Sequence, residues 1–335
     1  MPKLSVLIPT LNSQKTLALC LDSLYKQEFK DFELIIADGG STDNTISIAK
    51  KHHAKILRNV LKTAEAGKAL ALKHATSKYA LLLDSDNILP STFWLTDLIQ
   101  PLEDNPQVIG SEPWAFTYRP QAGFIERYCA LIGANDPYAW YTKKLDKTNY
   151  LTQSWPHPKL ILQENNKYII LKLSKVQTVP TIGANGTIFQ RSFLKKNLTS
   201  EYLFDIDIIN QALSKENILF AKTKNSIIHS YCESSITKFI RKQTRRMVDY
   251  YQYQNLRQTS WKTSPSSSDN IFFTLYSLLI LPAIFTSIFG YTKKQDKAWF
   301  FHPLACFLSA WIYITKYLQH KLGLLKSQNR LNWSQ

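Results

Sequence analysis

The sequence predicts an α/β fold with a doubly wound, mostly parallel sheet, followed by C-terminal helices that contact a membrane. Three observations indicate this fold. Short apolar strands alternate with amphipathic helices over roughly the first hundred residues. Polar residues follow the strand ends, and two long apolar stretches lie near the C-terminus. Short connections between alternating strands and helices favour parallel pairing, and such sheets bind ligands outside the carboxyl ends of their strands.

The expected strands are short apolar runs, and the expected helices start at residues that favour helix starts. We expect strands over 4–8, 33–38, 55–58 and 79–83. We expect helices after Asn12 and Ser13, after 41–43, and over 65–75. The middle of the chain has further strand-like stretches at 108–119, 167–173 and 218–229.

The charge balance favours polyanionic partners. The 335 residues include 41 Lys and Arg against 25 Asp and Glu, which gives a formal charge of +16. Nucleic acid, nucleotide phosphates and an anionic membrane surface are the partner classes that this charge predicts. The 4 cysteines have no CxxC spacing, which favours buried thiols in a reducing compartment. The N-terminus lacks the pattern of a secretory signal, so we expect the N-terminal part to stay in the cytosol.

The C-terminal third changes composition. A basic, helix-like segment over 236–262 is followed by a serine-rich linker and then by two apolar stretches, 271–290 and 298–318. Each stretch is long enough to cross roughly 30 Å of hydrocarbon, so we expect a membrane hairpin with both ends in the cytosol. The alternatives are buried core helices, or re-entrant helices kinked at Pro282 and Pro303. Three lysines in the connection over 291–297 argue against full spanning.

The clearest chemical signal is Asp84-Ser85-Asp86 at the end of an apolar strand. Two carboxylates at this spacing can face one cleft and hold Mg²⁺ or Mn²⁺ together with substrate phosphates. A solvated turn is the alternative explanation, and the motif alone is weak.

Two other strand ends predict a nucleotide site. They are Pro9-Thr10 with Asn12, and the run from Asp38 to Asp43, which contains two glycines. Small residues and backbone amides at a helix start favour close approach by a nucleotide, although Asp38 could equally be a turn residue. The sequence has neither the GxGxxG fingerprint nor the phosphate-binding P-loop.

These segments together resemble the successive signatures of family-2 glycosyltransferases, which have the nucleotide-diphospho-sugar transferase fold called GT-A. The resemblance rests on 5–12, 35–45 and 82–86, in this order and spacing, and covers roughly 1–235. It implies a nucleotide-sugar donor and Mg²⁺ or Mn²⁺. The resemblance implies nucleoside contacts for Pro9, Thr10, Asn12 and Asp38, a place near the ribose or metal for Asp84, and metal binding for Asp86.

The later motifs of the family are less regular here. The family has an acidic pair before a helix that supplies the catalytic base, and Asp205 fits its spacing better than the alternative, Asp207. His229 ends a strand where related transferases often place a metal ligand. The Gln-x-x-Arg-Trp motif of processive synthases is absent. Its region holds Arg241, Arg245 and Arg246, which we expect to bind phosphate or lipid headgroups.

Two loops and one lysine complete the predicted site. The loop over 181–187 resembles the family loop that closes on acceptor and sugar, and 132–137 has a similar character. Ordinary turns are the alternative for both loops, and a solvated helix lysine is the alternative for Lys68. The expected contacts are Gly183, Asn185 and Gly186 in the first loop, Asn135 and Asp136 in the second, and Lys68 on a phosphate.

The resemblance therefore implies a metal-dependent glycosyltransferase, and it favours inversion at the anomeric carbon. The apolar stretches and the arginine cluster over 241–246 predict in addition a membrane-presented acceptor, either a lipid-linked sugar or a polyprenyl phosphate. The alternatives are nucleotidyl transfer on the same fold and a basic protein that binds nucleic acid or lipid without catalysis. Lipid headgroups explain a basic stretch beside apolar segments better than nucleic acid does, so we expect no nucleic-acid partner. We expect a catalytic domain on the cytoplasmic side over 1–235, a basic helix and linker over 236–269, membrane helices over 270–320 and a basic tail over 321–335.

Overall fold

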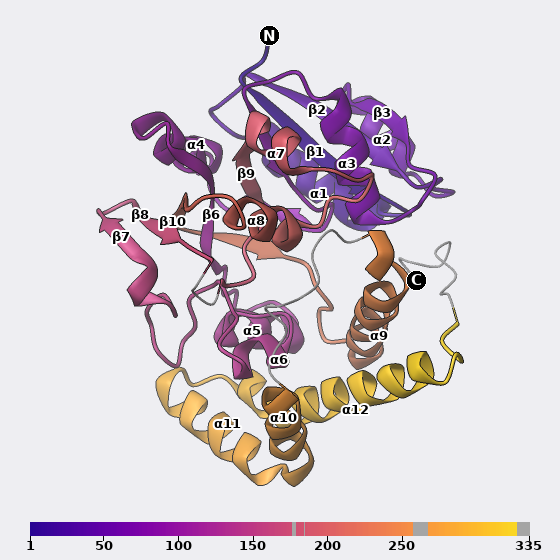
Figure 1. The fold of residues 1–335 in the computed structure, drawn as a ribbon, viewed down its shortest axis with the longest axis vertical. Coiled ribbons are helices and arrows are strands. Elements are labelled where there is room, and N and C mark those ends of the chain that lie inside the picture. The colour runs from indigo at the N-terminus through magenta and orange to yellow at the C-terminus, as the bar shows by residue number, and fades with distance from the viewer. Residues whose placement is uncertain (176–178, 184, 257–266, 327–335) are drawn as a thin grey trace.

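The computed structural model describes residues 1–175, 179–183, 185–256 and 267–326 (Figure 1). Within these residues the strands form one 10-stranded sheet in the order β3-β2-β1-β4-β9-β6-β10-β8-β7, with β5 paired to β10. Residues 257–266 contain the end of the expected basic segment and the start of the expected linker, and they lie outside the described residues. Most of the expected tail, 327–335, also lies outside them.

The N-terminal half has the predicted alternation of strands and helices. The strands β1 (Leu4–Thr10), β2 (Phe32–Asp38), β3 (Lys55–Arg58) and β4 (Tyr79–Leu82) are parallel to one another. The helices between them are α1 (Gln14–Tyr25), α2 (Thr45–Lys51) and α3 (Ala64–His74). The side chain of Thr63 caps α3 by accepting a hydrogen bond from the amide of Ala66, which satisfies one of the free amides of the first turn.

The C-terminal half of the sheet is mixed, so the prediction of a mostly parallel sheet holds for the N-terminal half. Only β6 and β10 are parallel to each other there. The short turn between β7 and β8 leaves no room for the crossover that parallel pairing needs. The strands of this half are β5 (Asn87–Ile88), β6 (Val108–Phe116), β7 (Ile161–Glu164), β8 (Tyr168–Leu173), β9 (Thr187–Gln190) and β10 (Ile218–His229).

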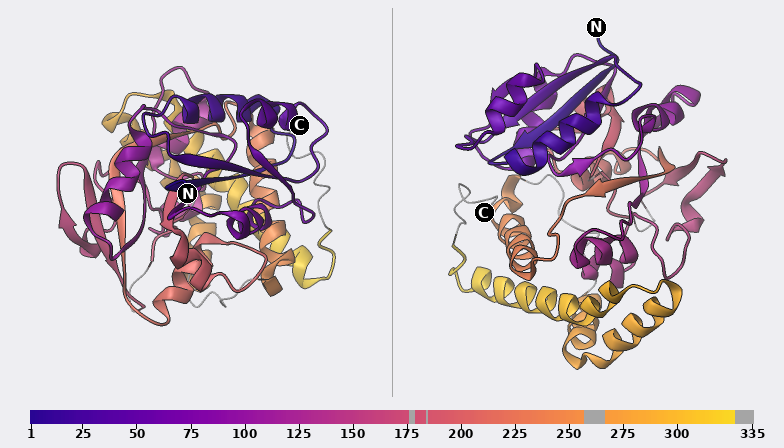
Figure 2. Two further views of the ribbon diagram at one scale, coloured as in Figure 1. Left: turned by 90° about the horizontal axis from the view of Figure 1, so that it is seen from above. Right: turned by 180° about the vertical axis from the view of Figure 1, so that it is seen from behind.

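Helices cover both faces of the sheet (Figure 2). One core cluster joins Val6 and Ile8 of β1 to α1 and α4 (Trp94–Asp104). The other joins Leu7 to α3 and α8 (Asp205–Leu213). This double cover explains why β1 is apolar along almost its whole length. The remaining helices of this part are α5 (Phe124–Ile132), α6 (Pro137–Tyr141), α7 (Arg191–Asn197) and the short η1 (Pro158–Leu160). All four cysteines are free and buried, as predicted.

The last three described helices lie together at the end of the molecule opposite the N-terminus, and the helix before them lies between the last helix and the sheet (Figure 1). These C-terminal helices are α9 (Ile236–Gln252), α10 (Ser267–Leu279), α11 (Leu281–Lys293) and α12 (His302–Lys321), with short turns η2 (Gln254–Leu256) and η3 (Lys297–Phe301). The predicted basic helix is therefore α9, which ends earlier than expected, at Gln252.

The first apolar stretch is broken into two helices near Pro282, where a kink is the expected alternative to a straight span. The chain bends by 80° between α10 and α11. Ile280, at the bend, has φ +59, and Pro282 follows two residues later. Proline lacks the amide that would continue the helix ladder, so the break falls where the sequence places this residue. The pair is either a broken span or a re-entrant loop.

The second apolar stretch, Lys297–Lys321, is long and apolar enough to cross a membrane, but half of its apolar window is buried inside the protein. The hydroxyl of Tyr128 in α5 lies 2.7 Å from Nδ1 of His302 in α12. Tyr313 of α12 donates a hydrogen bond to Asp136 at the start of α6. One face of α12 is thus packed on α5 and α6.

Candidate active site

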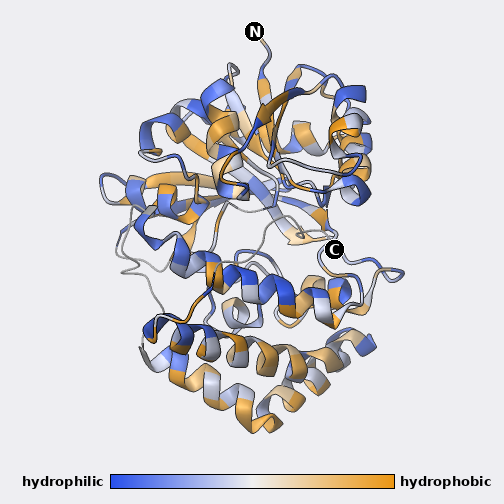
Figure 3. Cartoon of the chain, turned by 90° about the vertical axis from the view of Figure 1, so that its right-hand side faces the viewer, coloured by the Kyte–Doolittle hydropathy of each residue, from blue (hydrophilic) through white to orange (hydrophobic). Residues whose placement is uncertain are grey.

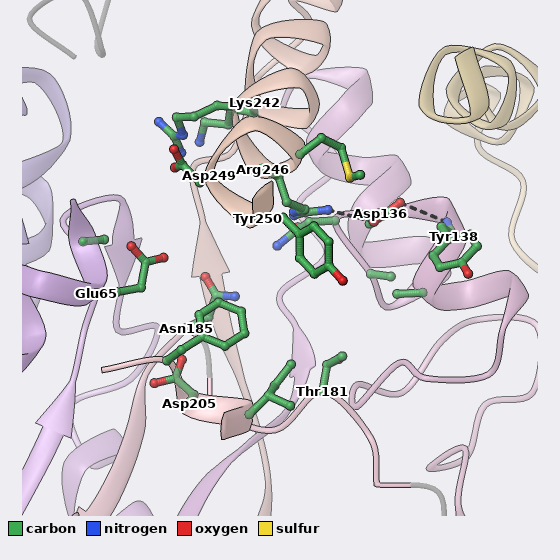
Figure 4. A pocket seen from close by; sticks show the side chains of 18 of the residues that line it. Glu65, Asp136, Tyr138, Thr181, Asn185, Asp205, Lys242, Arg246, Asp249 and Tyr250 are labelled. Carbon is green, nitrogen blue, oxygen red and sulfur yellow. Dashed lines mark hydrogen bonds and ion pairs between the residues drawn. The ribbon is translucent and has the colours of Figure 1, made fainter. Parts of the chain in front are cut away.

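A cavity of about 930 Å³ lies at the carboxyl ends of the N-terminal strands and extends to the C-terminal helices (Figure 4). It brings together most of the predicted site residues: Pro9, Thr10, Lys68, Asp84, Asp86, Asn135, Asp136, Asn185, Asp205, His229, Arg245 and Arg246. Six predicted residues do not line it: Asn12, Asp38, Gly183, Gly186, Asp207 and Arg241. The end that holds Asp84, Asp86 and Asp205 is called the catalytic end below.

Asp84 is paired with Lys68. The lysine ammonium lies 3.1 Å from Oδ1 of Asp84, and the Lys68 side chain is almost fully buried. Burial works to lower the pKa of Lys68, but Asp84 and Asp205 together raise it above its usual value. Lys68 therefore stays charged at the catalytic end, where a phosphate would meet a fixed cation.

Asp86 lies between two nitrogens. Its Oδ2 is 3.4 Å from Nε2 of His229 and 3.2 Å from Nζ of Lys242. Burial would raise the pKa of Asp86, but His229 and Lys242 hold it below its usual range. The other ring nitrogen of His229 also has a partner, because its Nδ1 lies 3.1 Å from Nδ2 of Asn135. Lys242 is a residue that the sequence reasoning did not assign to the site.

A divalent cation fits this arrangement in part. No group of three or more His, Cys, Asp and Glu side chains among the described residues could hold a metal ion alone. Asp86 and His229 offer an oxygen and a nitrogen side by side, and Mg²⁺ commonly takes only one or two protein ligands with phosphate oxygens and water. The buried Oδ1 of Asn135 has no hydrogen-bond partner in the described structure. An exchange of the Asn135 amide atoms would let Oδ1 accept from Nδ1–H and free Nε2 for a metal.

The residues predicted to contact the nucleoside do not all line the cavity. Pro9 and Thr10 line the cavity. Asp38 is buried below its own loop, where its carboxylate accepts hydrogen bonds from the amides of Gly40 and Ser41, both at 2.8 Å, and from the hydroxyl of Thr10 at 2.9 Å. Its oxygens shape the loop in the described structure, and the nucleoside contact expected for Asp38 stays a prediction.

Asn12 also acts within the loops. Its Oδ1 accepts a hydrogen bond of 2.8 Å from the amide of Thr42, and it has φ +49. Asparagine tolerates this left-handed backbone better than most residues, because its short side chain bonds locally. Asn12 therefore ties the first loop to the second, away from the cavity lining.

The structure separates the two predicted catalytic acids. Asp205 lines the cavity at the N-terminus of α8, whereas Asp207 is 3% exposed and does not line it. Burial raises the pKa of Asp205 to about 7 against the opposing effect of Lys68, and Asp84 and Glu65 raise it further. Its Oδ1 is buried without a hydrogen-bond partner in the described structure. A carboxylate with this pKa suits a general base near neutral pH.

The loop over 181–187, called the glycine loop, packs against Asp205 through Gly183. Gly183 and Gly186 have φ +118 and +83, which favour glycine, and Asn185 has φ +63. The Oδ1 of Asn185 accepts a hydrogen bond of 3.3 Å from Asn87, and Asn185 alone of the three lines the cavity. Ala184, between them, is outside the described residues.

A buried charge cluster below this loop was missed by the sequence reasoning. Glu112 of β6 accepts hydrogen bonds from the amide of Gly183 (3.1 Å) and the hydroxyl of Thr187 (2.9 Å). Lys222 of β10 lies 2.6 Å from Glu112 and 3.2 Å from Asp146, a cavity residue. The signal available in the sequence was a charge inside each of two apolar strands, a pattern that demands a buried partner.

The three arginines also differ from one another. Arg245 and Arg246 line the cavity and Arg241 does not. The guanidinium of Arg246 lies 2.9 Å from Oδ2 of Asp136. Asp136 in turn caps α6 by accepting from the amide of Tyr138. Asp136 and Arg246 thus balance each other, and Arg245 lines the cavity with Asp249 among the charges that act on it.

Comparison with known proteins supports one family. The sequence model described as Glycosyl transferase family 2 matches residues 5–197. The chain is similar to the uncharacterized glycosyltransferase YibD of Escherichia coli, with 32% identity over 120 residues, covering 34% of this chain and 35% of that protein. It is also similar to the poly(ribitol-phosphate) beta-N-acetylglucosaminyltransferase TarS of Staphylococcus aureus, with 38% identity over 97 residues, covering 27% and 17%. The matches therefore span about a third or less of these relatives.

One solved structure resembles almost the whole chain. It is the mannosyltransferase PcManGT from Pyrobaculum calidifontis in complex with GDP-Man and Mn²⁺. The TM-score is 0.54 at 14% identity, with 96% of this chain and 88% of that chain covered. At this identity the likeness shows a shared fold, which is the GT-A fold that the sequence predicts.

Proposed function

The chain belongs to glycosyl transferase family 2 and is a glycosyltransferase, and we propose that it transfers a sugar from a nucleotide-diphosphate sugar to a membrane-presented acceptor with a divalent cation bound. The observation that supports this most directly is the shared cavity. It joins the Lys68–Asp84 pair and the Asp86–His229 pair to the carboxylate of Asp205. Cations for a diphosphate and a base for an acceptor thus lie in one space.

The proposed reaction is a direct displacement. The acceptor oxygen attacks the anomeric carbon, the bond from that carbon to the diphosphate oxygen breaks, and the acceptor proton passes to Asp205. The nucleoside diphosphate leaves with the bonding electrons, beside the ammonium of Lys68. A single displacement of this kind inverts the anomeric carbon, and its transition state is oxocarbenium-like.

Asp86 and His229 would hold the cation, either Mg²⁺ or Mn²⁺. When bound, it supplies charge neutralisation to the leaving diphosphate. The Mn²⁺ in the complex of PcManGT supports a divalent cation at this kind of fold. Lys242, which contacts Asp86 in the described structure, would have to move aside for the cation.

The membrane contact is proposed from the surface of the C-terminal helices. Large apolar side chains of α10, α11 and α12 are exposed, among them Phe272, Leu279 and Phe285. Figure 3 shows that the helices at the end of the molecule away from the N-terminus are largely hydrophobic. Exposed apolar surface of this extent marks a membrane or protein contact. The basic helix α9 and the lysines after α11 add attraction to anionic headgroups. We propose a catalytic half on the cytoplasmic side of that membrane.

The test is a panel of nucleotide sugars with lipid extract as the acceptor source, with and without Mn²⁺. We expect one donor to give a labelled lipid product that depends on the cation, and thermal unfolding that shifts upward with that donor and Mn²⁺ together. Asp86→Ala should abolish both effects. Transfer of a nucleotide in place of the sugar, or equal sugar transfer after removal of all divalent ions, would contradict the proposal.

The alternative of a non-catalytic basic protein has a simple counter-test. RNA of mixed sequence should not displace the donor or reach comparable affinity at physiological salt. Nucleotidyl transfer is not favoured by any contact at the catalytic end, because the phosphate-binding elements there are lysines and a carboxylate pair in place of a glycine-rich loop.

A further inference from the structure

The cavity has a second part, lined by α6, α10 and α12, that the proposed reaction does not use. This part, called the apolar lobe here, is lined by Tyr138, Phe273, Thr274, Ala310, Ile314 and Tyr317. We propose that the apolar lobe binds the hydrocarbon chain of a lipid-linked acceptor, with the reacting head group at the catalytic end. The inference rests on the proposed function and names the acceptor class of the same site.

The spacing of the lining residues shows that single helix faces form the lobe. Phe273 and Thr274 of α10 lie three and four residues after Asn270, which also lines the cavity. On α12, Ala310, Tyr313, Ile314 and Tyr317 follow the same three-and-four spacing. Residues at this spacing share one side of a helix, so α10 and α12 each turn one stripe to the cavity.

Other faces of both helices carry exposed apolar side chains. On α10, Phe272 is 59% and Leu275 48% exposed, and on α12, Trp311 is 56% and Leu318 50% exposed. A lipid bilayer beside these faces would therefore be separated from the cavity by only one layer of helix. A lipid hydrocarbon chain that passes between α10 and α12 would move from the bilayer interior into the apolar lobe without contact with water.

The charge along the cavity matches an amphiphile. Asp205, Lys68 and Arg245 lie among the residues of the polar part, whereas the lobe is lined by aromatic, aliphatic and hydroxyl side chains and by the amide of Asn270. At the junction, Asp136 is neutralised by Arg246 and receives a hydrogen bond from Tyr313. Figure 4 shows Arg246 and Tyr250 of α9 extending into the space beside this junction. A polar head and an apolar tail would each meet a surface of their own kind.

Other occupants are outcomes of the test. A water-soluble acceptor would use the catalytic end alone and leave the lobe without a role. A detergent or bulk lipid molecule could enter the lobe without being a substrate. The proposal commits to the acceptor's own chain because the lobe is continuous with the cavity that holds Asp205.

The experiment uses the full chain in detergent and two acceptors with the same head group, one on a short water-soluble alkyl chain and one on a long polyprenyl chain. Ile314→Trp fills the lobe from α12. Leu318→Trp is the matched control, because Leu318 is 50% exposed and does not line the cavity. We expect Ile314→Trp to raise KM for the long acceptor by about tenfold, while KM for the donor and for the short acceptor stays unchanged.

A second pair guards against a variant that fails to fold. Thr274→Trp enters the lobe from α10, and Leu275→Trp is its exposed control. Thermal unfolding of each variant shows whether it is folded. Binding of a fluorescent polyprenyl analogue, measured without donor, should weaken in the two lobe variants and not in the controls.

The results separate the two levels of the proposal. Wild-type enzyme that prefers neither chain length, or lobe variants that change both acceptors equally, would overturn the lobe and leave the glycosyl transfer intact. Wild-type enzyme that transfers to neither acceptor but still hydrolyses the donor, with unimpaired analogue binding in the lobe variants, would overturn the lipid-linked acceptor itself.

Discussion

The backbone of Gly183 lies directly against the side chain of Asp205. A Cβ atom built at Gly183 would stand 2.3 Å from the Cβ of Asp205, where no real pair of carbons fits. On its other side, the amide of Gly183 donates to the buried carboxylate of Glu112. The loop is held from one side and leaves room on the other only for Asp205, so the place of the proposed base depends on a residue without a side chain.

Gly183→Ala should therefore reduce turnover by at least about tenfold, because either Asp205 or the loop must move. It should also lower the free energy of unfolding by about 1–3 kcal/mol, since φ +118 is strained for alanine. Gly40→Ala is the control, with φ +93 and nothing within 4 Å of the added carbon. Equal loss of kcat in both variants would show that backbone strain alone, and not the contact with Asp205, is responsible.

Asp205 should make the unliganded protein less stable as pH rises. Burial raises its folded pKa to about 7, above the unfolded value near 3.8. The folded state thus keeps a proton that the unfolded state loses, and stability falls between these two values. Asp205→Asn should be more stable than wild type by about 1–3 kcal/mol at about pH 8 and nearly equal at about pH 4, in denaturant titrations.

The control for this measurement is Asp207→Asn, two residues along the same helix but away from the cavity. Relative to wild type, Asp207→Asn should not gain stability between about pH 4 and about pH 8 in the way that Asp205→Asn does. A wild-type stability that increases from about pH 4 to about pH 8 relative to Asp205→Asn would contradict the raised pKa.

Lys242 should compete with a divalent cation. Its ammonium lies 3.2 Å from Asp86, and it also faces the ring of Tyr231 at 4.5 Å. Lys242→Met removes this charge, so Mn²⁺ should bind about three- to tenfold more tightly in the absence of donor, as measured from the free-ion signal in electron paramagnetic resonance. Lys238→Met, one turn earlier and 3.9 Å from the exposed Glu233, should leave the affinity unchanged. Weaker Mn²⁺ binding in Lys242→Met would refute competition at Asp86.

Much of the N-terminal fold could be predicted because its signals are local. Apolar runs predict β1 to β4, and Asp84 and Asp86 follow β4, a strand that is buried on both faces. The antiparallel half could not be predicted in this way. The place of β9 between β4 and β6 is set by pairing across more than seventy residues of sequence, which periodicity does not encode.

The site could be predicted as a set of residues but not as a set of contacts. The motif around Asp38 indicates a nucleotide site equally well whether the carboxylate faces a ligand or its own loop. Lys242 reaches Asp86 from a helix more than a hundred and fifty residues away. Such pairings depend on α9 lying beside the turn that holds Asp86, a tertiary relation that no short spacing in the chain reveals.

The protein should float with anionic vesicles and less with zwitterionic ones. Leu279 and Phe285, on either side of the bend, are 63% and 68% exposed. Glutamate at either position should abolish flotation, because a carboxylate at an apolar contact must be desolvated. Phe93→Glu, at an exposed position on the catalytic half, should float like wild type. Full-length protein that stays in the soluble fraction with anionic vesicles would exclude the membrane contact.

The chemistry of the acceptor decides which residue is indispensable. A sugar hydroxyl must lose its proton as it attacks, which requires a base. A lipid phosphate is already an anion and requires only cations to hold it. The cavity offers both, Asp205 for a hydroxyl and Arg245 for a phosphate. We expect a hydroxyl acceptor, because the buried Oδ1 of Asp205 has no partner in the described structure and its pKa of about 7 suits proton transfer.

Asp205→Asn should therefore lower kcat by roughly two to four orders of magnitude, because the amide cannot accept the proton. Arg245→Ala should act mainly on KM. Asp207→Asn and Arg241→Ala, outside the cavity lining, are the matched controls for the acid and the arginine. Single-turnover rates of each variant with a lipid-linked sugar and with a polyprenyl phosphate distinguish a hydroxyl acceptor from a phosphate acceptor. If Asp205→Asn keeps its rate while Arg245→Ala loses it, the acceptor is the phosphate, and Asp205 then serves to position the glycine loop in place of moving a proton.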